Sequence, residues 1–197
     1  MNKRPEKTEQ TKADLQEAFW QLYAASPIDS ITIQQICDRA GYNRGTFYLH
    51  YHDIYELLSA IEEAQLEGMA ACVEACMQRI EGKDSKLVKV AALTDVMRYY
   101  EANKKYVTLL LGAKAKENPQ FIVRLKDRLK PLWRVYVIRD TEDRTAQEID
   151  LMLEYVLTGA LFMISLWLQE PGDVSAYQIG HLVYDTAIRD VNDRVRL

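Results

Sequence analysis

The stretch TIQQICDRAGYNRGTFYLHYHD, residues 32–53, decides the fold of the N-terminal part of the chain. Thr32 begins a capping-box pattern that predicts the start of a helix. Gly41 stands where a helix ends in the left-handed conformation, and Asn43 can cap a second short helix, Arg44 to His50. Two short helices joined by a glycine turn are typical of a helix-turn-helix, whose second helix enters a DNA groove.

The rest of the chain follows the 3.6-residue period of helices, with no long strand-like alternation. A first helix is predicted from about Thr11 to Ala24, ending before a Ser-Pro pair, and a long one from Ile54 to about Ile80. Further helices are predicted over residues 85–102, 106–111, 121–139, 145–168 and 174–193. We therefore expect an all-α fold of about nine helices.

Composition is that of an ordinary globular protein, with 48% hydrophobic and 27% charged residues in a chain of 197. No signal peptide is visible, and the longest uncharged stretch, Tyr155 to Gln169, is shorter than the roughly 18 apolar residues of a membrane span. We expect a soluble cytoplasmic protein. Its three cysteines are an odd number, which indicates free thiols.

The charge of the chain does not by itself indicate a nucleic-acid partner, since the net charge is −4. Residues 1–53 carry six basic and seven acidic side chains, residues 103–139 ten and two, and residues 140–197 four and eleven. The basic predicted helix 121–139 has two readings: a solvated face offset by the acidic last third, or a surface for an anionic ligand or DNA. The case for DNA binding therefore depends on the helix-turn-helix geometry.

The order of residue types in the N-terminal part resembles the TetR family of bacterial transcriptional regulators. The resemblance covers residues 11–57 and is carried by Ala40-Gly41, Gly45-Thr46-Phe47-Tyr48, His50-Tyr51 and Leu57. Beyond residue 60 it is only architectural. It implies a helix-turn-helix DNA-binding domain over 1–53, whose residues 1–10 we expect to be mobile, and a helical ligand-binding and dimerisation domain over 54–197.

The resemblance also implies the residues that meet DNA. The implied set is Thr32, Tyr42, Asn43, Arg44, Gly45, Thr46, Tyr48 and His50. Arg44 can hydrogen-bond guanine with two donors, and Tyr48 can donate to a phosphate. Phe47 and Tyr51 are four residues apart and are expected to anchor the helix to the core. One departure stands out: Ile54 occupies the position where the family usually has lysine, which predicts weaker contact with phosphate.

The stretch YVLTGALFMISLWL, residues 155–168, is apolar on nearly all sides and must be buried on more than one face. We expect it to form a two-fold interface together with the last helix. The predicted dimer residues are Tyr155, Gly159, Ala160, Met163, Trp167, Ile179, Leu182 and Val183. A pocket for a small hydrophobic inducer is predicted to be lined by Met69, Cys72, Met97, Tyr100, Trp133, Tyr136, Phe162 and Met163.

Other groups of residues with a recognisable spacing indicate a function less strongly. Cys72 and Cys76 have helical spacing, which allows a metal or thiol sensor, but buried structural thiols are the alternative. His50 and His52 point to different faces of a helix. We expect no catalytic residue, metal site or cofactor, and hence no enzyme. The predicted function is a homodimeric repressor that binds palindromic operator DNA and is released by a small hydrophobic ligand. The alternative is a ligand-binding or protein-partner module of this fold, such as a co-activator, with weak or no DNA binding.

Overall fold

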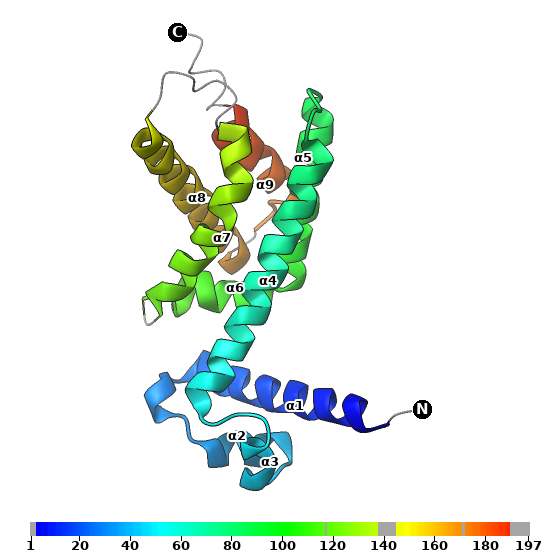
Figure 1. Ribbon diagram of the computed structural model, residues 1–197, viewed down its shortest axis with the longest axis vertical. Coiled ribbons are helices and arrows are strands. Elements are labelled where there is room, and N and C mark those ends of the chain that lie inside the picture. Colours follow the sequence, from blue (N-terminus) through cyan, green and yellow to red (C-terminus); the bar gives the residue numbers. More distant parts are fainter. Residues whose placement is uncertain (1–2, 117, 138–144, 171, 190–197) are drawn as a thin grey trace. The chain divides into compact units, whose positions relative to one another are not determined.

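The computed structural model describes residues 3–116, 118–137, 145–170 and 172–189, with the side chains of 3–6, 135–137 and 189 outside this description. These residues form nine α-helices and no strand, which confirms the all-α prediction (Figure 1). The helices are α1 Lys3–Ala25, α2 Ile33–Ala40, α3 Arg44–Tyr48, α4 Ile54–Ile80, α5 Lys86–Ala102, α6 Lys104–Thr108, α7 Pro119–Val137, α8 Ala146–Gln169 and α9 Ala176–Val183. The chain divides into two compact units, one up to Ala64 and one from Gln65 onward.

Unit 1 is a small helical domain built on α1, α2 and α3, and the start of α4 belongs to it. Leu15 and Phe19 of α1 are fully buried, together with Ile36 of α2 and Phe47 of α3. Burying a side chain of this size contributes roughly 1.5–3 kcal/mol. Because α2 and α3, with eight and five residues, are too short to be stable alone, this shared apolar contact with α1 is what holds them in place.

The first helix is longer than the sequence pattern predicted. It begins at Lys3 rather than Thr11, so residues 3–10, which we expected to be mobile, form its first turns. Side chains one turn apart support this polar segment: Gln10 donates a 2.7 Å hydrogen bond to Asp14, and Lys12 pairs with Glu9 at 3.1 Å. The apolar periodicity begins only at Leu15, so a prediction based on that periodicity does not include the polar turns that precede Leu15.

Unit 2 consists of the second part of α4 together with α5 to α9 (Figure 1). The contact between α5 and α9 is especially close. A β-carbon at Gly180 of α9 would lie 2.9 Å from the backbone nitrogen of Thr94 on α5. Only glycine allows that separation, so the two helix backbones approach each other through this residue.

Two helical turns of unit 2 are wider than an α-helix. Residues Leu109–Ala113 and Tyr184–Arg189 form π-type turns, and the backbone amide of Lys114 donates to the carbonyl of Leu109 at 2.8 Å. The predicted last helix over 174–193 therefore begins at Ala176 and changes pitch after Val183. Its predicted end lies outside the described residues.

Helix α8 is long and apolar enough to cross a membrane by length and composition, but 44% of that stretch is buried inside the protein. Leu153, Leu157 and Leu161 of this helix are among the core residues of unit 2. A core helix passes the same test of length and hydropathy, because both environments select apolar side chains.

The basic face of α7 is partly neutralised by α8. Glu154 accepts from Lys126 and lies 3.2 Å from the Lys130 amine, and Arg134 lies 3.8 Å from Asp150. The hydrogen bond from Lys126 lowers the pKa of Glu154 below its ordinary value. This pairing favours the reading in which the basic face is offset by the acidic last third of the chain. Arg139 lies outside the described residues.

Candidate nucleic-acid interface and inner cavity

Local hydrogen bonds that the sequence predicted cap α2 at both ends and α3 at its start. Thr32 and Gln35 form the reciprocal capping box of α2, and Gly41 closes that helix with φ 77°, in the left-handed region. The side-chain oxygen of Asn43 then accepts a 2.8 Å hydrogen bond from the amide of Thr46. Caps of this kind contribute about 1 kcal/mol each, so the turn has a defined geometry before any ligand binds.

The inner side of α3 is fixed to the core. Phe47 is fully buried and its ring lies 5.8 Å from that of Tyr51, which is 6% exposed. Gln16 of α1 donates a 2.9 Å hydrogen bond to the Tyr51 hydroxyl, and burial raises the pKa of this tyrosine. The prediction that Phe47 and Tyr51 anchor the helix is confirmed.

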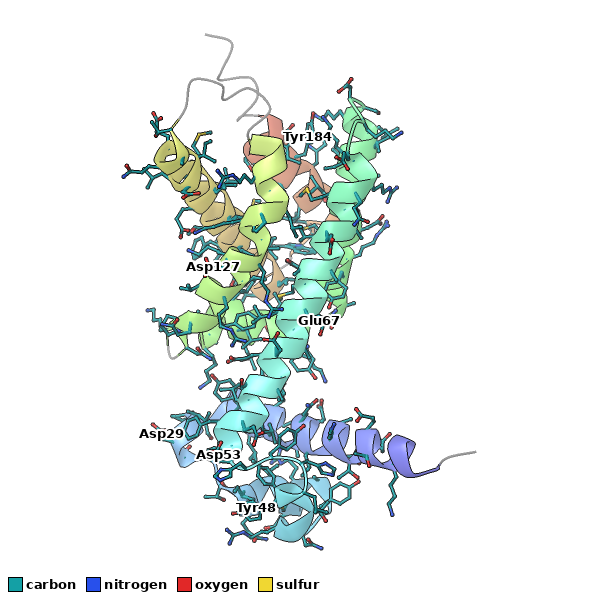
Figure 2. The ribbon with its side chains drawn as sticks, in the orientation of Figure 1. Asp29, Tyr48, Asp53, Glu67, Asp127 and Tyr184 are labelled. Atoms are coloured by element: carbon teal, nitrogen blue, oxygen red, sulfur yellow. The ribbon has the colours of Figure 1, made fainter. Side chains whose placement is uncertain are left out.

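The outer side of α3 faces solvent. Arg44 and Gly45 are exposed, Tyr48 is 51% exposed and Leu49 is 80% exposed. The guanidinium of Arg44 donates to the Tyr48 hydroxyl at 3.2 Å, which orders both side chains on this face. Figure 2 shows Tyr48 on the outer side of unit 1. The Arg44 guanidinium, the Tyr48 phenol and the apolar Leu49 side chain are thus all exposed on α3 or directly after it.

The remaining predicted contact residues divide into two kinds. Thr32 is exposed, whereas Thr46 and His50 are half-buried. Asn43 is engaged as a cap, and the Tyr42 hydroxyl donates to Asp14 of α1 at 2.8 Å. In the unbound chain Tyr42 and Asn43 therefore position α3.

Leu49 was missed by the sequence analysis, although simple arithmetic could have found it. At 100° per residue, position 49 lies on the opposite side of the helix from the midpoint of positions 47 and 51. Once Phe47 and Tyr51 are assigned to the core, Leu49 has to point outward, as it does.

The N-terminus of α4 is already occupied by the chain's own carboxylates. Asp53 accepts hydrogen bonds from the amides of Tyr55 and Glu56, at 2.9 and 2.8 Å, and Glu56 accepts one from the amide of His52. The bond from the Glu56 amide is the main cause that lowers the pKa of Asp53. These amides are the groups that an anion at a helix N-terminus would use, and Ile54 offers no charge beside them.

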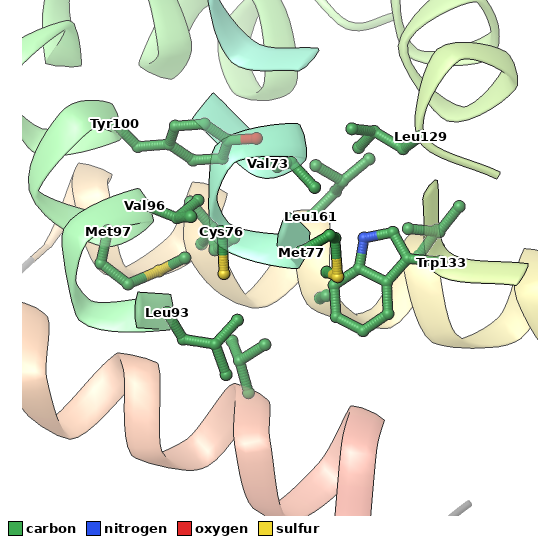
Figure 3. A pocket seen from close by; sticks show the side chains of 14 residues that line it. Val73, Cys76, Met77, Leu93, Val96, Met97, Tyr100, Leu129, Trp133 and Leu161 are labelled. Atoms are coloured by element: carbon green, nitrogen blue, oxygen red, sulfur yellow. The ribbon is translucent and has the colours of Figure 1, made fainter. Parts of the chain in front are cut away.

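Unit 2 encloses an apolar cavity of about 30 Å³ (Figure 3). Helices α4, α5, α7, α8 and α9 all contribute to its wall. Among the predicted pocket residues, Met97, Tyr100 and Trp133 line it. Cys76, Ala160 and Val183 also line it, although the sequence analysis had placed Ala160 and Val183 at a dimer interface.

Four predicted pocket residues lie elsewhere. Met69 is fully buried away from the cavity, and Cys72 lines a separate surface hollow of about 170 Å³ beside Arg79. Phe162 is 64% exposed and, like Met163, belongs to an outer groove of α8. Phe162 and Met163 differ from the prediction because α8 is apolar on every side, so its sequence does not separate the inward face from the outward one. The Tyr136 side chain lies outside the description.

The outer groove has a volume of about 570 Å³ and is lined from α8, α9 and the segment between them. Gly159, Met163, Trp167 and Ile179, all predicted dimer residues, line it. Trp167 and Ile179 are mostly buried, and the Trp167 indole donates to the Val174 carbonyl at 2.7 Å.

Further large apolar side chains of α8 and α9 are exposed. Tyr155 is 78% exposed and Leu182 is 45% exposed. Leu151, Leu166 and Tyr177, which the sequence analysis did not select, are also more than half exposed.

The three cysteines are free thiols, as predicted. Burial raises the pKa of Cys76 to about 12, and burial also raises the pKa of Cys72. Both groups are therefore protonated at neutral pH, which disfavours metal binding and thiolate chemistry. Within the described part of the chain, no three histidine, cysteine or acidic side chains are grouped so as to hold a metal ion.

An anchored recognition helix with a polar outer face, followed by a helical second domain, defines a helix-turn-helix regulator. Residues 16–61 match the family model for bacterial regulatory proteins of the tetR family. This match bears out the resemblance seen in the N-terminal sequence.

Solved structures extend the likeness to the whole fold. A TetR transcriptional regulator from Streptococcus agalactiae 2603V aligns with a TM-score of 0.64 and 19% identity, covering 94% of this chain and 98% of that one. The regulator PfmR from Thermus thermophilus gives 0.60 and 18%, covering 89% and 97%. The dihydroxyacetone kinase operon activator DhaS gives 0.58 and 14%, covering 93% and 97%. No curated protein matches the sequence significantly. The chain thus has the fold of a TetR-family transcriptional regulator.

Proposed function

We propose that this protein is a cytoplasmic, homodimeric repressor that binds palindromic operator DNA through α3 and is released by a small hydrophobic ligand. The observation that carries the proposal is the two-sided character of α3. Its inner side is buried through Phe47, and its outer side presents Arg44, Tyr48 and Leu49 to solvent. Side chains exposed on a rigidly held helix can contact base edges with little further ordering.

The side chains on the outer face of α3 suit a major-groove site that offers a guanine, a thymine methyl group and a phosphate. Arg44 can bond guanine bidentately, Leu49 can contact a thymine methyl group, and Tyr48 can donate to a phosphate. In the free chain Arg44 and Tyr48 are bonded to each other, so binding exchanges that bond for contacts with DNA. The net gain is accordingly smaller than the number of contacts suggests.

Dimerisation is supported by the exposed apolar surface of α8 and α9. A set of large apolar side chains this extensive is unusual on a monomer and is typical of an interface. Two copies related by a two-fold axis would present two copies of α3 to two half-sites about one DNA turn apart.

Ligand release is supported by the cavity of unit 2. A ligand that binds one conformation of unit 2 more tightly shifts the population toward it, and DNA affinity falls by that differential binding. We expect no catalysis, since the proposed mechanism requires only binding.

The proposal is tested by selection from random duplex DNA with the purified protein. We expect enrichment of an inverted repeat whose half-sites are about one helical turn apart. A selection that returns no inverted repeat would count against sequence-specific binding by a homodimer.

A matched pair of variants then assigns the contact to α3. Arg44→Ala should weaken specific binding by about 5- to 150-fold, which corresponds to the roughly 1–3 kcal/mol of a good bidentate pair. Arg39→Ala removes the same charge from α2, where this arginine donates to Gln21 at 3.1 Å, and should have a much smaller effect. Equal losses in the two variants would mean that only net charge matters.

The second candidate, a ligand- or partner-binding module with weak DNA affinity, is favoured by the N-terminus of α4. The Asp53 carboxylate occupies the amides there and Ile54 replaces a cation. The solved relative DhaS is described as an operon activator, so the fold is not confined to repressors. No measurable binding to DNA even at low salt would favour this candidate, because phosphate contacts are strongest there.

A further inference from the structure

The cavity of unit 2 is lined by a hydrogen-bond donor that has no partner among the described residues, and its position indicates the chemistry of a ligand. We propose that this cavity binds a compact, uncharged molecule that is mostly apolar and carries one hydrogen-bond acceptor, which receives the indole N–H of Trp133. The inference deepens the proposed function, since it names the ligand class of that regulator.

The donor is fully enclosed. Trp133 is 4% exposed, and its Nε1 atom is buried without a hydrogen-bond partner among the described residues. Trp167, by comparison, donates to a backbone carbonyl at 2.7 Å. Buried donors in folded proteins almost always have an acceptor, because leaving one unpaired is unfavourable. An acceptor supplied from outside the chain therefore fits the site.

The donor also points into the cavity. Figure 3 shows the indole nitrogen of Trp133 and the hydroxyl oxygen of Tyr100 turned toward the space beside Val73. Both residues line the same cavity, and Tyr100 is 1% exposed. A ligand in this cavity would thus meet two polar groups, the Trp133 indole N–H and the Tyr100 hydroxyl, while the rest of it meets mostly apolar side chains.

The rest of the wall excludes charge. The described residues that line the cavity are apolar apart from Tyr100, Trp133 and the Cys76 thiol. Burial keeps that thiol neutral, with its pKa raised to about 12. An ion would lose its hydration here without finding a counter-ion, so a carboxylate or an ammonium is disfavoured.

Size limits the ligand as well. A volume of about 30 Å³ exceeds the roughly 10–15 Å³ needed for one water molecule but is well below the ~150 Å³ of an apolar cavity that binds benzene. A ligand larger than water has to widen the cavity. Met77 and Met97 line it, and their unbranched side chains can change rotamer to do so.

The test uses two probes of the same shape, cyclopentanone and methylenecyclopentane, which differ in having a carbonyl oxygen or a methylene group. Binding to the full-length protein without DNA is followed by the three tryptophan indole N–H resonances. Trp133→Phe assigns one resonance by its loss. We expect cyclopentanone to move the Trp133 resonance downfield and methylenecyclopentane to leave it in place.

Affinities give a second readout. We expect the ratio of ketone to alkene affinity to fall about tenfold in Trp133→Phe, in line with the roughly 1.4 kcal/mol of one hydrogen bond. Trp167→Phe, the control, should keep the wild-type ratio. An unchanged ratio in Trp133→Phe, or no binding of either probe at millimolar concentration, overturns the proposal. A Trp133 resonance that cyclopentanone does not move also overturns it, because the indole N–H would then be donating to a bound water molecule and not to the ligand. Because no DNA is present, these outcomes are independent of whether the protein binds an operator.

Discussion

Replacing Gly180 by alanine tests how closely α9 and α5 pack. The added β-carbon would lie 2.9 Å from the backbone nitrogen of Thr94, 3.0 Å from its Oγ1 and 3.1 Å from its Cα. The hydroxyl cannot easily give way, because it donates a 2.7 Å hydrogen bond to the Val90 carbonyl. Thr94 is also 4% exposed, so no solvent space receives it.

Two effects of opposite sign decide the magnitude. Alanine in a helix interior is favoured over glycine by about 0.5–1 kcal/mol. Forcing a methyl group into a packed core costs roughly 1–3 kcal/mol, and contact with backbone atoms places this case in the upper part of that range. We expect a net loss of about 1–2 kcal/mol, which lowers the melting temperature by several degrees at roughly 2–4 °C per kcal/mol.

Gly159→Ala is the matched control, because a β-carbon at this helical position meets no atom within 4 Å. It should raise the stability of the single chain by up to about 1 kcal/mol. Both variants are followed by thermal and urea unfolding at several protein concentrations, since a contact between two copies at Gly159 adds a concentration-dependent contribution. A rise in melting temperature for Gly180→Ala equal to that of Gly159→Ala would refute the close approach of α5 and α9.

Three further predictions concern the site. Ile54→Lys should strengthen nonspecific DNA binding and steepen its salt dependence by about one unit of log–log slope, measured by fluorescence titration; an unchanged slope would mean that this helix end does not meet phosphate. Since the pKa of Asp53 is lowered in the folded protein, its contribution to stability is present above the unfolded value near 4 and disappears as pH falls through the folded value. Asp53→Asn, which keeps the cap, should flatten unfolding curves across that acid range, and a full wild-type pH dependence would contradict this. Cys76, with its pKa at about 12, should react with a thiol reagent at pH 7.5 at least about tenfold more slowly than an unfolded control, and equal rates would contradict its burial.

Much of unit 1 was predictable because its signals are local. The Thr32 box, the left-handed Gly41 and the Asn43 cap each depend on residues within a few positions, and all three form as expected. The burial of Phe47 and Tyr51 follows from their spacing of four residues, which places both on one side of the helix. The extension of α1 back to Lys3 was missed because polar turns carry no apolar period.

The helices of unit 2 were predictable from the sequence, but the side of α8 that faces the interior was not. The boundaries of α4 and α8 agree with the sequence pattern to within a residue or two. The inner cavity and the outer groove could not be separated, because Ala160 and Met163 occupy one uniformly apolar helix and nothing local distinguishes their surroundings.

The order of residue types alone determined that the chain is helical, where the capped helices α2, α3 and α8 begin, and that Phe47 and Tyr51 face the core, since these features depend on neighbours about a turn away. Only the tertiary structure decided that the Trp133 donor has no acceptor in the part of the chain that the structure describes, that Asp53 accepts from the first amides of α4 and that Gly180 lets two helix backbones approach closely. Each of these features depends on which residue, distant in sequence, packs against the site or on which rotamer a side chain adopts. The periodicity of a helical sequence carries no information about either.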